Sequence, residues 1–205
     1  MKYIELRSCF KNFIVFSFAD IKKIDPSFFP ARLNEWQKKG YIRKIIRGYY
    51  YFSDQEYREQ ELFYVANKIF KPSYISMETA LSWHNLIPEA VYGITSVATR
   101  RTRTFKTPLA SFFYRTVSPS LFFGYRLELV QNAHYAIAEK EKAVLDYCYL
   151  NSRLRKEEDF AGMRVNSEEF FRGFDREKFN NYLERFKNSS LERRISVLLK
   201  VIENA

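Results

Sequence analysis

The pattern of apolar and polar positions changes from a helical to a β period within residues 30–52. Leu33 and Trp36 stand three residues apart in a polar segment, so both fall on one face of a helix. The proline that opens the segment suits a first helical position, and Gly40 suits the left-handed end of a helix. Residues 41–52 are rich in β-forming side chains, with Arg47 and Gly48 between two runs. The pattern predicts a helix, then a hairpin that turns at Arg47 and Gly48.

A shorter helix is predicted before this segment. Ser17 is a suitable N-cap for a helix over Ser17–Ile24, and Asp20 stands at its third position. An earlier helix is expected within Met1–Phe16. Two helices followed by a basic hairpin are the order of a winged helix-turn-helix, which we predict for residues 1–54. An ordinary helix-and-hairpin corner with a solvated face, or a winged helix that binds protein, would show the same pattern.

The remainder, residues 55–205, has the pattern of a separate α+β domain. Ser53 and Glu56 form a capping-box pattern that predicts a helix over about Gln55–Phe70. Its apolar stripe consists of Leu62, Val65, Ala66 and Ile69. Tyr74 and Ile75 suggest a short strand, after which Ser76 would cap a helix to about His84.

From Val91 onward the pattern becomes β and then helical. Strands are predicted at Ile94–Thr99, Ala110–Val117, Tyr125–Val130 and Tyr135–Ala138. Helices are predicted at Glu139–Leu150 and Asp175–Phe186, and a second capping box at Ser189–Glu192 opens a last helix. The expected fold is α+β, with a small, mainly antiparallel sheet and a helical C-terminus.

Charge adds a function to the N-terminal pattern. Residues 1–54 hold eleven basic and five acidic residues. Their net charge, 11 − 5 = +6, is more than half of the formal net charge of +10 of the whole chain. Because Lys and Arg neutralise phosphates, such an excess is typical of DNA-binding proteins. The DNA-contacting candidates are Arg32, Asn34, Lys38 and Lys39 on the helix, and Arg43, Lys44 and Arg47 on the hairpin. Residues early in the helix usually meet base edges, so Arg32 and Asn34 are the expected readers.

A second basic segment, with Arg100, Arg101, Arg103 and Lys106, lies in the body. In an extended strand Arg101 and Arg103 would share a face, and the segment could form a second patch that contacts phosphates of DNA or RNA. Arg115 and Arg126 on neighbouring strands could widen this patch. A solvated hairpin end is the alternative. Lys140 and Lys142 alternate with Glu139 and Glu141, which is typical of the solvent face of a helix.

Several classes of protein are disfavoured. No apolar run approaches the ~20 residues of a membrane span, and no signal peptide is recognisable, so a cytoplasmic protein is expected. Cys9 and Cys148 are isolated, and His84 and His134 are the only histidines, so neither a disulfide nor a metal site is expected. There is no glycine-rich phosphate loop and no nucleophile elbow, and the one Asp-x-Lys lies at Asp20–Lys22. We therefore expect no enzyme and no cofactor.

The stretch Tyr74–Leu150 resembles a known family. The resemblance rests on the order and spacing of Ser73–His84, Leu86–Tyr92, Thr95–Thr102, Leu121–Tyr125 and Ala138–Asp146. These segments are similar to those of the AbiEi-type antitoxins, whose layout also begins with a winged helix, and the match extends over about residues 15–200. One departure is Ala138–Lys142, where relatives usually have a small residue and a proline before Glu-Lys-Ala.

The resemblance implies an antitoxin of a toxin-antitoxin, or abortive-infection, system. Its N-terminal domain would repress the operon by binding inverted repeats in promoter DNA. Its C-terminal domain would counteract a paired nucleotidyltransferase-like toxin, and the family leads us to expect no stable complex between the two. The alternative is a binding module that grips the toxin or its RNA target, with the winged helix as scaffold.

Overall fold

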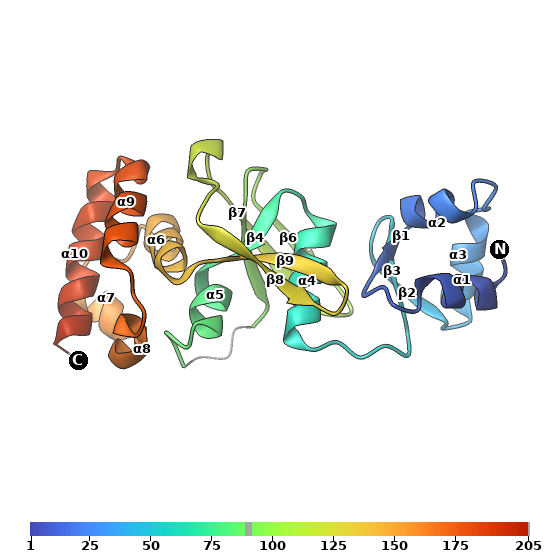
Figure 1. The fold of residues 1–205 in the computed structure, drawn as a ribbon, viewed down its shortest axis with the longest axis horizontal. Helices are drawn as coiled ribbons and strands as arrows, with labels where there is room; N and C mark the ends of the chain where they lie inside the picture. Colours follow the sequence, from blue (N-terminus) through green and yellow to red (C-terminus); the bar gives the residue numbers. More distant parts are fainter. Residues whose placement is uncertain (89–91, 205) are drawn as a thin grey trace.

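The computed structural model describes residues 1–88 and 92–204 and has an α+β fold. Figure 1 shows an elongated molecule with the N-terminal unit (residues 1–54) at one end. A six-stranded sheet occupies the middle, and helices form the other end. We call everything after the N-terminal unit the body. Val91, where the β pattern was predicted to begin, lies outside the described residues, together with Glu89 and Ala90 of the resemblance.

The N-terminal unit combines three helices with a three-stranded antiparallel sheet of order β1-β3-β2. Its elements in chain order are α1 (Tyr3–Phe10), β1 (Phe16–Ser17), α2 (Phe18–Ile24), α3 (Ala31–Lys38), β2 (Ile42–Ile46) and β3 (Tyr49–Phe52). The predicted cap of α2 is confirmed: the Asp20 N–H donates to Ser17 Oγ at 3.1 Å, and the Ser17 N–H donates to Asp20 Oδ2 at 2.9 Å. Burial alone would raise the pKa of Asp20, but the Ser17 hydroxyl and the Ser17 N–H both donate to its carboxylate, and together they lower that pKa.

The helix-and-hairpin prediction is also confirmed. Pro30 lies one position before α3, as its N-cap, and Gly40 ends the segment with φ of +72°. Ile46 pairs with Tyr49, which leaves Arg47 and Gly48 as the two-residue turn, and Gly48 has φ of +87°. A left-handed residue at this turn is what the glycine permits.

The central sheet has six strands in the order β6-β7-β5-β4-β9-β8. The strands are β4 (Ser73–Ile75), β5 (Ile94–Ala98), β6 (Arg103–Lys106), β7 (Ser111–Thr116), β8 (Tyr125–Val130) and β9 (Ala133–Ala138). Two neighbouring pairs, β4 with β9 and β5 with β7, are parallel. The sheet is therefore larger and more mixed than the predicted small, mainly antiparallel one, because alternation marks a strand but says nothing about its partner.

Two helices of the body accompany this sheet, α4 (Glu59–Ile69) and α5 (Met77–Trp83), with a short 3-10 turn at Pro119–Leu121. The predicted start of the first helix at Ser53–Glu56 is wrong, since α4 begins after Arg58. Residues 55–57 are instead tied to the N-terminal unit. The Gln55 side chain donates to the carbonyl oxygen of Phe13 at 3.4 Å, and the Tyr57 hydroxyl donates to that of Ile14 at 2.6 Å. The predicted stripe is buried at Val65, Ala66 and Ile69, and partly so at Leu62.

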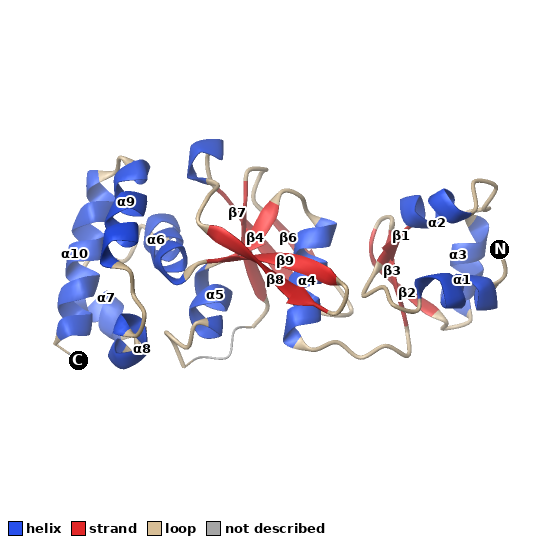
Figure 2. Cartoon of the chain, viewed as in Figure 1, coloured by secondary structure: helices blue, strands red, loops and turns tan. Residues whose placement is uncertain are grey.

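The C-terminal end is helical, as Figure 2 shows. Its helices are α6 (Lys140–Leu150), α7 (Glu157–Ala161), α8 (Ser167–Phe171), α9 (Arg176–Phe186) and α10 (Ser189–Glu203). The cap of α10 differs from the prediction: Asn188, not Ser189, is the N-cap, and its Oδ1 accepts from the Leu191 N–H at 2.9 Å.

The prediction for the solvent face of α6 is wrong. Lys142 is 0% exposed and Glu141 is 3% exposed, and Lys140 donates to the carbonyl oxygens of Glu169 and Arg172. The cause is position: α6 lies between the sheet and the other C-terminal helices, so it has no broad free face (Figure 1). Charge alternation alone cannot reveal such a position.

Two hydrophobic clusters hold the chain together. One is confined to the N-terminal unit and includes Phe16, Leu33 and Trp36. The other fills the body and also takes in four residues of the N-terminal unit: Ile14, Val15, Ile45 and Tyr51. The two units therefore have separate cores and a shared apolar contact. Within the described residues, no helix has the length and apolar character needed to cross a membrane.

Candidate nucleic-acid interface

Helix α3 exposes its polar face on the N-terminal unit. Leu33 and Trp36 are buried beneath it, which fixes the helix against the core. The predicted contact residues Arg32, Asn34, Lys38 and Lys39 are all exposed. The structure thus brings these four side chains to one helix and its C-terminal end.

Two of the four already have partners. Arg32 Nη1 donates to the carbonyl oxygen of Met1 at 2.7 Å, and Lys39 Nζ pairs with Glu35 Oε1 at 2.7 Å. The hydrogen bond between Lys39 and Glu35 raises the pKa of the lysine and lowers that of the glutamate. Asn34 only receives a long contact of 3.5 Å from Gln37. Asn34 is therefore the less engaged of the two expected base readers.

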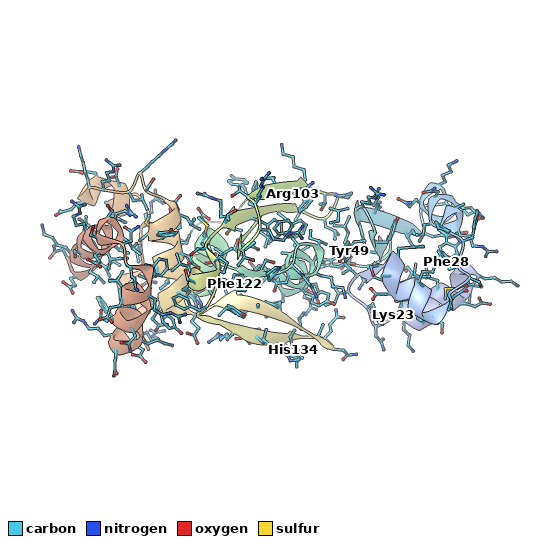
Figure 3. The ribbon with its side chains drawn as sticks, turned by 90° about the horizontal axis from the view of Figure 1, so that it is seen from above. Lys23, Phe28, Tyr49, Arg103, Phe122 and His134 are labelled. Carbon is cyan, nitrogen blue, oxygen red and sulfur yellow. The ribbon has the colours of Figure 1, made fainter. Side chains whose placement is uncertain are left out.

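The hairpin residues Arg43, Lys44 and Arg47 are exposed as well. A β-bulge lies between Lys44 and Ile46, and the extra residue, Ile45, packs into the core of the body. Figures 1 and 3 show the hairpin on the side of the N-terminal unit that faces the body, with Tyr49 near the junction. Figure 1 shows α3 on the far side. The helix and hairpin cations thus form two surfaces of one unit.

The basic segment of the body is arranged differently from the prediction. Only Arg103 and Lys106 lie in β6, because the chain bends at residues 99–100 and residues 101–102 are irregular before the strand begins. The expectation that strand alternation places Arg101 and Arg103 on one face is therefore wrong. The guanidinium of Arg100 lies 4.8 Å from the ring centre of Phe70. All four cations of the segment, Arg100, Arg101, Arg103 and Lys106, are exposed.

Two arginines expected to widen this patch do not. Arg115 donates to the carbonyl oxygen of Leu150 at 2.9 Å, which turns its charge toward α6. Arg126 lies in β8, at the opposite edge of the sheet from β6, and pairs with Glu128 at 2.6 Å. The patch is therefore limited to the bend and the edge strand β6.

A third basic surface was not predicted. Arg155, Arg193 and Arg194 line an open hollow of about 660 Å³ beside α10, with Ser190, Ser196 and Val197. Arg194 is only 9% exposed and donates through Nε to the carbonyl oxygen of Cys148 at 2.9 Å. In the described part of the chain, none of these three arginines forms an ion pair with a carboxylate. The tandem Arg193 and Arg194 on α10 was the available sequence signal.

A cluster of charged and hydroxyl side chains lies in the interior of the body. Lys142 contacts Asp146 in a buried ion pair and donates to the Tyr74 hydroxyl at 2.8 Å. Asp146 Oδ2 also accepts from the hydroxyls of Tyr74 and Ser76, both at 2.8 Å. Ser76 thus precedes α5 as expected, but its hydroxyl does not cap the helix.

Burial dominates the protonation of this cluster. It lowers the pKa of Lys142 against the attraction of Asp146, and it raises that of Tyr74 well above its usual value, with Asp146 adding to the shift. Lys142 and Asp146 are both fully enclosed, so no substrate reaches them. The polar groups satisfy one another, which is the requirement for burying charge. We assign the cluster to structure.

The remaining candidates for chemistry are satisfied or isolated. His84 Nε2 donates to the carbonyl oxygen of Ala138 at 2.9 Å. His134 is exposed on β9, and the thiols of Cys9 and Cys148 are free. Among the described residues, no group of three or more His, Cys, Asp or Glu side chains is placed to hold a metal ion.

Comparison with known proteins adds no identification. No model of a protein family matches the chain. No curated protein matches it either. We therefore infer function from the surfaces described above and from the resemblance of the sequence segments.

Proposed function

We propose that the chain is a DNA-binding repressor and antitoxin, with residues 1–54 as a winged helix-turn-helix. The observation that carries the proposal is the N-terminal unit itself. Its elements follow the order helix, strand, helix, helix, strand, strand, and its third helix presents Arg32, Asn34 and Lys38 to solvent above a buried Leu33 and Trp36. In a helix-turn-helix the second helix of the motif enters the major groove, and in this proposal α2 and α3 are its first and second helices.

In this proposal α3 reads bases and the other cations bind phosphate. Asn34 suits adenine, which an amide recognises with two hydrogen bonds, and Arg32 suits guanine once it leaves the Met1 carbonyl. Lys38, Lys39, Arg43, Lys44 and Arg47 contribute charge without base preference. The DNA partner is the promoter of the chain's own operon, at inverted repeats, as the family resemblance implies.

The antitoxin half of the proposal rests on the AbiEi-type resemblance of the body. The body counteracts a nucleotidyltransferase-like toxin, without a stable complex, and works in the cytoplasm without a cofactor and without catalysis of its own. Arg100, Arg101, Arg103 and Lys106 are its exposed cations at the sheet edge.

The first test compares promoter DNA with scrambled DNA in electrophoretic shifts over a salt series. Specific binding should weaken steeply with salt, with a slope near −0.9 per phosphate neutralised. Asn34→Ala should cost about 1–3 kcal/mol on the promoter alone. Arg47→Ala should weaken both duplexes equally, and Arg176→Ala, an exposed arginine on α9, is the matched control. Equal binding of both duplexes by the parent protein contradicts the proposal.

The second test separates the two activities. A fragment that begins at Ser53 should still protect cells from the paired toxin while repression is lost. Reversal of Arg100, Arg101 and Arg103 to Glu in that fragment tests the sheet-edge cations, and circular dichroism checks folding. A folded fragment without protection contradicts the antitoxin assignment to the body.

A second candidate function is an RNA-binding module that sequesters the toxin's target. The arginine hollow favours it, because Arg155, Arg193 and Arg194 line one hollow and have no acidic partner in the described part of the chain. Arginine side chains that are not paired with a carboxylate are suited to bind phosphate groups. RNA binding that is lost in an Arg155→Glu, Arg193→Glu variant with intact promoter binding supports the module, and unchanged RNA binding excludes it.

A further inference from the structure

One edge of the central sheet carries a row of apolar side chains that are partly or largely exposed. Strand β8 is an edge strand, and Tyr125, Leu127 and Leu129 on it are 38%, 65% and 62% exposed. Alternate residues of a strand share one face, so the three side chains form a row. The opposite edge differs: β6 carries the exposed cations Arg103 and Lys106, and such charges keep edges from pairing.

The backbone of the same three residues points out of the sheet. The Ala136 N–H donates to Asn67 Oδ1 at 2.6 Å, and the Ala138 carbonyl accepts from His84 Nε2, so both point away from β8. Their partners on β8 are Leu127 and Tyr125. In an antiparallel ladder, a pair that does not bond internally directs the N–H and C=O groups of both residues outward. The free edge of β8 thus presents the backbone groups of Tyr125, Leu127 and, by alternation, Leu129.

The two charged residues between the outward residues, Arg126 and Glu128, would attract the same two residues of a second, antiparallel copy of β8. Arg126 and Glu128 flank Leu127, and both lie on the opposite face from the apolar row. If a second β8 strand pairs antiparallel about Leu127, Arg126 faces Glu128 of the other copy, and Glu128 faces its Arg126. A centre at Arg126 or Glu128 would instead oppose like charges, and a centre at Tyr125 or Leu129 would leave two of the three outward residues without a partner on the other β8.

We propose that β8 is a homodimer interface, in which two copies pair antiparallel about Leu127 and form a continuous twelve-stranded sheet from two six-stranded ones. Leu127 meets Leu127 of the second copy at the two-fold axis, and Tyr125 lies opposite Leu129. The interface is isologous, since the same strand serves both copies. This inference goes beyond the proposed function, because it involves neither DNA nor toxin.

The pairing also fixes how the copies are arranged. Figures 1 and 3 show the β8–β9 hairpin lying lengthwise in the molecule, and Figure 3 shows it along one margin, with His134 pointing outward. Antiparallel pairing therefore turns the two copies end for end. Their N-terminal units then lie at opposite ends of the dimer, where each remains accessible.

Sedimentation velocity of the full chain, over a concentration series without DNA, tests the proposal. The parent protein should shift from monomer to dimer as concentration rises. Arg126→Glu and Glu128→Arg should each place like charges opposite one another twice, and should each raise the dissociation constant about tenfold or more. Glu177→Arg, which reverses an exposed glutamate on α9, is the control and should dimerise like the parent.

The decisive sample is an equimolar mixture of the two single variants. One copy then carries two acids and the other two bases, so the heterodimer regains both attractions and should form at the parent's concentration. The double variant Arg126→Glu, Glu128→Arg should dimerise with itself for the same reason. A parent that stays monomeric throughout, or single variants that dimerise like the parent, would overturn the proposal, and so would a mixture that fails to associate.

Discussion

At the scale of single residues, the buried pair of Lys142 and Asp146 has the largest predicted effect. Lys142→Met leaves the Asp146 carboxylate buried without its cation, and should lower the free energy of unfolding by about 3–5 kcal/mol. Lys142→Met combined with Asp146→Leu removes both charges and should recover most of that loss. Urea unfolding measures both. Lys200→Met, which breaks an exposed pair with Glu157, is the matched control and should change little. A double variant as unstable as the single one would contradict this account.

His84 should make stability depend on pH. Burial lowers its pKa in the folded chain, as do the charges of Arg126 and Lys140, while the hydrogen bond to Ala138 and the charge of Glu141 oppose the shift. The folded state therefore excludes a proton that the unfolded chain accepts. As pH falls below the ordinary histidine value of 6.5, the unfolded state gains that proton first and the free energy of unfolding decreases.

The measurement for His84 is urea unfolding on either side of that pH. His84→Gln removes the titrating group, so the part of the acid loss that His84 causes should disappear. His134→Gln, which changes the exposed histidine on β9, should keep the dependence of the parent. An unchanged dependence in His84→Gln would show that carboxylates alone govern this pH range.

At the scale of elements, two residues are candidates for the N-cap of α10. The sequence favoured Ser189, whereas the structure assigns the cap to Asn188, whose Oδ1 accepts from the Leu191 N–H. Asn188→Ala should therefore cost about 1 kcal/mol of unfolding free energy, and Ser189→Ala much less. Thermal unfolding of the two variants measures both losses. A larger loss in Ser189→Ala than in Asn188→Ala would show that Ser189 is the N-cap.

The elements also show why some sequence predictions succeeded. The Ser17 and Asp20 cap was predictable because both partners lie within one helical turn, and no distant group competes. The cap predicted at Ser53 failed because its neighbours Gln55 and Tyr57 bond to Phe13 and Ile14, about forty residues earlier. The positions of β5, β7, β8 and β9 followed from alternation, whereas β6 was not among the predicted strands. The parallel pairing of β5 and β7 depends on a crossover that no local pattern encodes.

The surfaces of the candidate site also include some features that the sequence could predict and others that it could not. Exposure of the α3 residues was predictable, because Leu33 and Trp36 define the buried face. The burial of Lys142 was not, since α6 has helices and a sheet on both sides, and its charge pattern matches that of a solvated helix. The arginine hollow also needed the fold, because Arg155 and Arg193 are far apart in the sequence and meet only through the packing of α10 beside α7.

At the scale of the whole molecule, two cores joined by a small contact should unfold in two steps. The N-terminal unit has its own cluster, and it shares few apolar residues with the body: Ile14, Val15, Ile45 and Tyr51 are buried there, and Ile46 and Tyr49 are partly buried. A unit of about fifty residues buries a smaller fraction of its surface than a larger one, so it should unfold at the lower denaturant concentration. The hydrogen bond from Tyr57 to Ile14 couples the two steps.

The two tryptophans report these steps separately. Trp36 lies in the N-terminal core, and Trp83 packs against Phe63 and Tyr135 in the body. In Trp83→Phe the fluorescence follows the N-terminal unit, and in Trp36→Phe it follows the body. We expect the first urea midpoint to be lower, and Tyr57→Phe, added to each, to widen the gap by weakening the junction. Coincident midpoints in all four proteins would mean that the shared contact makes the chain one cooperative unit, and a fragment beginning at Ser53 would then lose much of its stability.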